Sequence, residues 1–66
     1  MLNVKMVREG IEMIKLKKHD NEMAHFYEDE LYTTVLEEIA RGCRNGKKLA
    51  QEALKAKKIE FPRWCA

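Results

Sequence analysis

The sequence predicts a small all-α domain of three helices with an extended C-terminal tail, and three observations support this fold class. The chain has 66 residues with only three glycines and one proline, which is typical of one helix-rich domain. Apolar residues recur at helical spacing in three segments. Gly42 and Pro62 follow the second and third segments, where a helix commonly stops. We therefore expect a single helical domain over residues 1–66.

The first helix is expected over residues 4–18, with Asn3 as its N-cap. Gly10 lies inside it, either as a tolerated surface residue or where another backbone comes close. The cations of residues 17–19 suit the negative end of a helix. One face of this helix is apolar, because four residues follow each other in steps of three and four: Val4, Val7, Ile11 and Ile14.

The second helix is expected over residues 22–41, with Asp20 or Asn21 as its cap and Gly42 as its stop. Its apolar stripe comprises Met23, Tyr27, Leu31, Val35 and Ile39, and Phe26, Tyr32 and Leu36 flank that stripe. Two competing geometries stay open. The first two helices can form one long bent helix, and the second and third can run on without a break.

The third helix is expected over residues 47–58, with a thin stripe of Leu49, Ala53 and Leu54. Pro62 disfavours a helical conformation at Phe61, so residues 59–66 are expected to be extended. Phe61 and Trp64 either fold back onto the core or form an exposed aromatic anchor for a partner.

Charge is segregated along the chain, although the net charge is only +2. Residues 21–40 hold six acidic and no basic residues, whereas residues 41–66 hold eight basic and two acidic ones. These blocks either neutralise each other, within the fold or across a dimer, or leave the basic third for an acidic partner such as nucleic acid.

A chain this short buries only about 60% of its unfolded surface and usually needs a disulfide, a metal or a second subunit. Cys43 and Cys65 have no CxxC spacing and follow no secretory signal, so we expect free thiols in the cytoplasm. His19 and His25 form no paired ligand motif with the cysteines, so no metal is expected. No apolar run reaches the ~18 residues of a membrane span. A homodimer joined through the first helix is the remaining expectation.

Enzyme chemistry and cofactors are not expected. His25 forms an i,i+4 pair with Asp29 and an HxxE step with Glu28, which reverses the Glu-x-x-His order of di-iron bundles. The chain contains no serine and no glycine-rich phosphate loop.

The sequence favours a non-catalytic module that self-associates and binds or modulates a cytoplasmic protein. The candidate interface comprises Val4, Val7, Ile11, Ile14, Phe61 and Trp64, although the same residues can fill the chain's own core. In length and composition the chain resembles the small accessory proteins of bacteria and their temperate phages.

The alternative is a small DNA-binding regulator of helix-turn-helix type. Its phosphate contacts would be Arg41, Arg44, Lys47 and Lys48, around the turn before the third helix. Asn45 stands where such a unit needs an apolar residue, and an acidic second helix would repel the DNA backbone.

Overall fold

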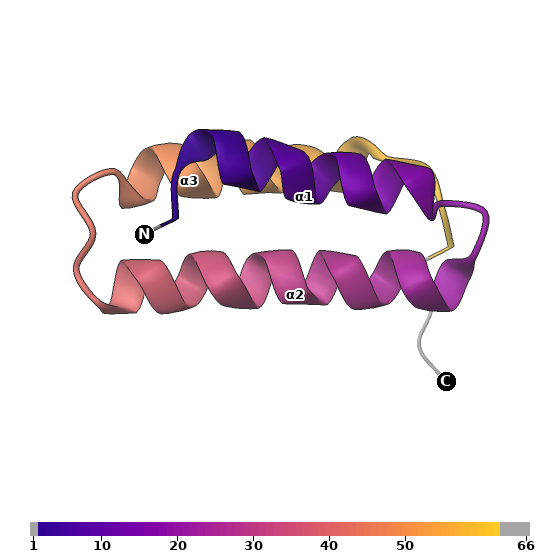
Figure 1. The fold of residues 1–66 in the computed structure, drawn as a ribbon, viewed down its shortest axis with the longest axis horizontal. Coiled ribbons are helices and arrows are strands. Elements are labelled where there is room, and N and C mark those ends of the chain that lie inside the picture. The colour runs from indigo at the N-terminus through magenta and orange to yellow at the C-terminus, as the bar shows by residue number, and fades with distance from the viewer. Residues whose placement is uncertain (1, 63–66) are drawn as a thin grey trace.

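The computed structural model describes residues 2–62 and confirms an all-helical fold. Its elements are α1 (Val4–Leu16), α2 (Asn21–Ala40), α3 (Gly46–Ala53) and the 3₁₀ helix η1 (Leu54–Lys58). α1 and α3 run in the same direction on one side of the molecule, and α2 runs antiparallel to both on the other side (Figure 1). Each of the three α-helices packs against the other two.

α1 begins as the sequence predicts and ends two residues earlier. Asn3 is its N-cap, because the Asn3 side chain accepts a hydrogen bond of 2.9 Å from the backbone N–H of Met6. After Leu16 the chain turns, and the Asp20 side chain accepts a 3.3 Å hydrogen bond from the backbone N–H of Met23. This cap starts a separate helix, so the first two helices are not one bent helix.

α2 buries a different set of residues from the predicted stripe. Leu31 and Val35 are buried as expected, but the other buried positions are Ala24 and Glu28, one residue after Met23 and Tyr27. Met23 and Ile39 are 36% and 38% exposed. The predicted stripe was therefore only partly right, because α2 contacts both α1 and α3 and its buried face is set by the two together.

α2 ends at a Schellman motif formed by Gly42. Gly42 has a φ of 87°, its N–H donates to the carbonyl of Ile39 at 2.9 Å, and the N–H of Cys43 donates to the carbonyl of Glu38 at 3.4 Å. A glycine adopts this left-handed conformation without the steric cost of a Cβ. The turn over residues 41–45 therefore separates α2 from α3, and the continuous-helix alternative is wrong.

α3 starts at Gly46, one residue before the predicted start, and the last five residues of the predicted helix form the 3₁₀ helix η1. Ile59 leaves η1 with extended dihedral angles, and the side chains of Ile59 and Phe61 fold back into the core. Trp64 lies outside the described residues, as does the rest of the predicted tail beyond Pro62. The core comprises Val7, Ile11, Ile14, Ala24, Leu31, Val35, Leu49, Ala53, Ala56, Ile59 and Phe61.

Candidate protein-binding groove

An apolar groove of about 510 Å³ runs between α2 and the α3–η1 segment, and we call it the α2–α3 groove. The helices come close together at one end of the groove, where a Cβ built on Gly46 would lie only 3.1 Å from Cγ1 of Ile39. Ala50 and Ala53 line the groove with side chains too short to fill it. The full lining is Glu28, Tyr32, Val35, Leu36, Ile39, Ala50, Ala53, Leu54 and Lys57.

Two leucines give the groove its exposed apolar surface. Leu36 of α2 is 65% exposed and Leu54 of η1 is 56% exposed, and one stands on each side of the groove. Ile39 adds a third large apolar side chain. A contiguous apolar surface on a small chain is typical of a site that binds another protein.

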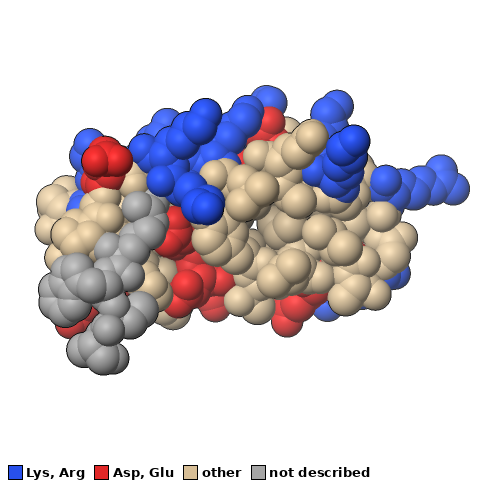
Figure 2. Space-filling view, turned by 180° about the vertical axis from the view of Figure 1, so that it is seen from behind, with Lys and Arg blue, Asp and Glu red and all other residues tan. Residues whose placement is uncertain are grey.

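The charges lie along the two edges of this apolar surface. Figure 2 shows lysines and arginines gathered mainly over the α3 side, acidic residues over the α2 side, and an uncharged stretch between them. Lys57 lines the groove from η1 and is exposed. Glu28 lines it from α2 but is 4% exposed, and it accepts a 3.3 Å hydrogen bond from the Tyr32 hydroxyl. A partner would therefore meet one basic and one acidic edge.

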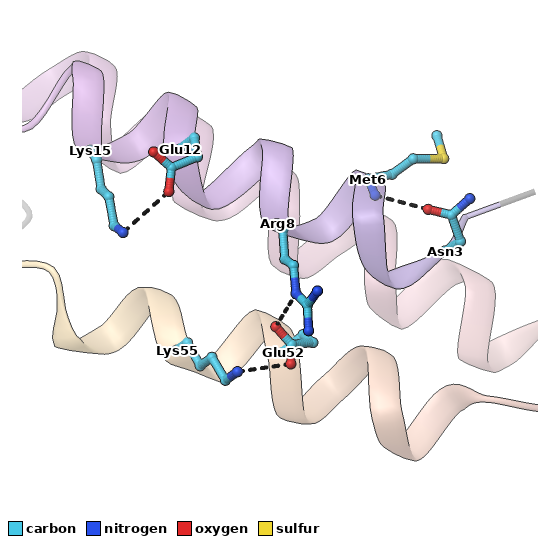
Figure 3. A network of polar contacts seen from close by, with 7 residues as sticks. All are labelled: Asn3, Met6, Arg8, Glu12, Lys15, Glu52 and Lys55. Carbon is cyan, nitrogen blue, oxygen red and sulfur yellow. Dashed lines mark hydrogen bonds and ion pairs between the residues drawn. The ribbon is translucent and has the colours of Figure 1, made fainter.

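A second groove, of about 720 Å³, lies between α1 and the α3–η1 segment and is lined mainly by charged residues. Figure 3 shows that Glu52 of α3 contacts both Arg8 of α1 and Lys55 of η1 in this groove. One carboxylate oxygen of Glu52 accepts a 3.1 Å hydrogen bond from Nε of Arg8, and the other accepts a 2.8 Å bond from Nζ of Lys55. Arg8 and Lys55 lower the pKa of Glu52 to about 2, with the Arg8 hydrogen bond as the largest cause.

Carboxylates of the second groove hold three of the five cations that line it. Arg8 and Lys55 share Glu52, and Lys15 pairs with Glu12 at 3.2 Å. An incoming anion would compete with these carboxylates for the same donors. The Arg8–Glu52 pair joins residues 44 positions apart and clamps α1 to α3, which is a structural role.

The structure places most of the predicted interface residues inside the chain. Val7 and Ile14 are fully buried, Ile11 is 7% exposed and Phe61 is 9% exposed. Val4 is partly buried against the same core. For these residues the alternative reading, that they fill the chain's own core, is the one the structure supports, because α2 and α3 already cover the apolar face of α1. Trp64 lies outside the described residues.

The four predicted DNA-contacting residues are all exposed near the turn between α2 and α3. Arg41 is already paired with Glu38 at 3.0 Å. Arg44 lies in the turn, and Lys47 and Lys48 lie in the first turn of α3. A helix-turn-helix joins its helices at about 90–120°, whereas α3 returns antiparallel along α2 (Figure 1). The predicted geometry of a DNA-reading helix is therefore not formed.

The predicted His25–Asp29 pair and the HxxE step both lie on α2, and Glu28 of that step lines the α2–α3 groove. Nδ1 of His25 lies 3.2 Å from Oδ2 of Asp29, so the predicted i,i+4 pair forms on α2. Within residues 2–62, no three histidine, cysteine or acidic side chains gather in a way that could hold a metal ion. Over the same residues, no helix is long and apolar enough to cross a membrane.

Sequence reasoning missed Leu36 and Leu54 as site residues. Leu54 was assigned to the apolar stripe of the third helix and Leu36 to the flank of the second helix's stripe, and both are more than half exposed. One signal was available. Apolar residues on α2 cover more of the helix circumference than one neighbour can bury, because Leu36 and Ile39 extend the face that holds Val35.

Comparison of the chain with protein-family models, curated proteins and solved structures found no match. The surfaces of the chain itself therefore carry the evidence on function.

Proposed function

We propose that this chain is a non-catalytic, cytoplasmic accessory protein that works by protein–protein interaction, and that the α2–α3 groove is its binding surface. The observation that carries this proposal is the pair of leucines, Leu36 and Leu54, exposed on opposite sides of a hollow groove. An amphipathic helix laid into such a groove would bury both leucines against its own apolar residues.

Self-association is part of the proposal, and it uses this groove in place of the first helix. The side chains that were expected to join two copies through α1 belong to the core. The α2–α3 groove, in contrast, offers apolar side chains that no element between residues 2 and 62 buries. Burying them would add to the small core of a 66-residue chain.

The test is a comparison of two leucine variants of equal exposure. Leu36 in the groove and Leu16 at the end of α1 are both 65% exposed, so Leu36→Glu and Leu16→Glu place the same charge on two different surfaces. We expect proteins captured from the source cell by the tagged wild-type chain to be captured by Leu16→Glu as well and to be lost with Leu36→Glu. Equal capture by all three proteins would contradict the proposal, provided that circular dichroism shows equal helix content.

DNA binding is the second candidate function, supported by the exposure of Arg44, Lys47 and Lys48 together at one end of the molecule. Titration of duplex DNA at low and moderate salt tests it, since affinity from phosphate contacts falls steeply as salt rises. The variant Lys47→Gln with Lys48→Gln should then weaken binding. Absence of binding to the wild type at low salt would exclude this candidate.

A further inference from the structure

The two edges of the α2–α3 groove carry opposite charges at matching places along the helices. On η1, Leu54 and Lys57 are three residues apart, and in a 3₁₀ helix such side chains lie directly above one another. On α2, Asp29 precedes Leu36 by seven residues and so lies on the same side of the helix. Each edge of the groove therefore has one exposed leucine and one charged residue.

Lys57 and Asp29 also lie near the same end of the groove. α3 begins beside Ile39, near the C-terminal end of α2, and then runs antiparallel to α2 (Figure 1). Lys57 is consequently beside the N-terminal half of α2, where Glu28 lines the groove with it and Asp29 is the next residue. Asp29 pairs with His25 of the same helix, but its side chain is still 65% exposed. None of the five ion pairs of the described residues includes Lys57.

We propose that the occupant of the α2–α3 groove is a second copy of this chain, related to the first by a two-fold axis parallel to α2. This inference rests on the proposed function. A 180° rotation about that axis keeps each residue's position along the helices and exchanges the two edges of the groove. The basic edge of each copy then faces the acidic edge of the other, and Lys57 faces the partner copy's acidic edge at the level of its Asp29.

The opposite orientation is unfavourable. A two-fold axis lying across the helices would place the basic edge of one copy against the basic edge of the other, and the acidic edges would meet in the same way. Like charges placed face to face at an interface lower affinity and exclude that arrangement. In the orientation we propose, two-fold symmetry makes each favourable contact twice.

The experiment is sedimentation equilibrium of the full chain and five variants over a wide concentration range. We expect the wild type to form dimers, Leu36→Glu to be monomeric, and its matched control Leu16→Glu to be dimeric. Lys57→Glu and Asp29→Lys should each raise the dimer dissociation constant by about tenfold, because two attractive contacts become repulsive.

Exchanging the two charges tests whether the single variants weaken the dimer because Lys57 and Asp29 face each other across the two-fold axis, or only because a charge is lost. The double variant Asp29→Lys with Lys57→Glu restores opposite charges across the two-fold axis, so its dissociation constant should return to within about threefold of wild type. Circular dichroism of each variant, which should match the wild type, shows that the change lies in association and not in folding.

Three results would overturn the inference, and they differ in what else they affect. A wild type that stays monomeric at the highest concentration removes the second copy but leaves the groove open to another protein. A dimer that Leu36→Glu does not weaken removes both this inference and the use of the groove in self-association. A dimer that Leu36→Glu breaks but the charge variants leave unchanged removes only the two-fold arrangement.

Discussion

Gly10 of α1 lies directly against Leu31 of α2, and a Cβ built on Gly10 would come within 3.1 Å of Cδ1 of Leu31. The helix thus has a glycine in its interior, which costs about 1 kcal/mol relative to alanine, at the point where α1 meets a large side chain of α2. One interpretation of the sequence was that another backbone comes close to Gly10. The structure shows a side chain there instead.

We expect Gly10→Ala to change the free energy of unfolding little in the wild type, because the gain in helix propensity is offset by crowding of Leu31. In a Leu31→Ala background the crowding is gone, and Gly10→Ala should stabilise the protein by about 1 kcal/mol. Thermal unfolding of the four proteins of this double-mutant cycle measures the difference. The same effect of Gly10→Ala in both backgrounds would mean that Gly10 and Leu31 do not interact.

Gly42 should tolerate replacement poorly for a different reason. No atom lies within 4 Å of a Cβ built there, so the cost of Gly42→Ala comes from the φ of 87° alone. A left-handed conformation costs an alanine about 1–2 kcal/mol, which should lower the melting temperature by roughly 4–8 °C per kcal/mol in a domain of this size. Gly42→Asn, which adopts this conformation more readily, should cost less; an alanine variant as stable as wild type would contradict this account.

The ends of the helices could be predicted from the sequence because they depend on neighbouring residues only. Asn3 caps α1, Asp20 caps α2 and Gly42 stops α2 through contacts within five residues along the chain. Pro62 in the same way marks where regular structure has ended. Such signals need no knowledge of which helices pack together.

The buried face of α2 and the groove could not be predicted, because they depend on where three helices lie relative to each other. Glu28 lies outside the apolar stripe predicted for the second helix, yet it is 4% exposed and hydrogen-bonded to Tyr32. Leu54 was assigned to an apolar stripe and Leu36 to the flank of one, yet both are more than half exposed. Helical spacing alone shows which residues share a face, but it leaves open which part of a wide apolar face another helix covers.

The position of Ile11 makes a further prediction. Ile11 is 7% exposed and belongs to the core, so Ile11→Glu should place a carboxylate against buried apolar side chains. That cost is several kcal/mol, comparable to the whole stability of a domain this small, and the variant should lose its cooperative thermal transition. Leu36→Glu, on the exposed side of α2, should keep its transition in dilute solution. A folded Ile11→Glu protein would show that α1 is less enclosed than the structure has it.

The contacts of Glu52 with Arg8 and Lys55 predict how the stability of the fold depends on pH. Because Arg8 and Lys55 lower the pKa of Glu52 from 4.5 to about 2 in the folded chain, the folded state favours the carboxylate more strongly than the unfolded state does. The stabilisation is therefore fully present above pH 4.5 and is lost as the pH falls from 4.5 to about 2. Glu52→Gln removes this contribution, so its melting temperature should lie below that of wild type at pH 6 and approach it near pH 2.

The matched control for this prediction is Glu12→Gln in the same groove, where an exposed carboxylate pairs with Lys15 alone. An exposed pair of this kind contributes about 0–1 kcal/mol, so we expect only a small difference from wild type at any pH. Arg8→Gln supplies a second readout, because without its main hydrogen bond the pKa of Glu52 should rise toward 4.5 in an NMR titration of the side-chain carboxyl carbon. If Glu52 instead titrates in its ordinary range in the wild type, or keeps its low pKa in Arg8→Gln, the Arg8–Glu52 contact does not hold α1 to α3 in solution.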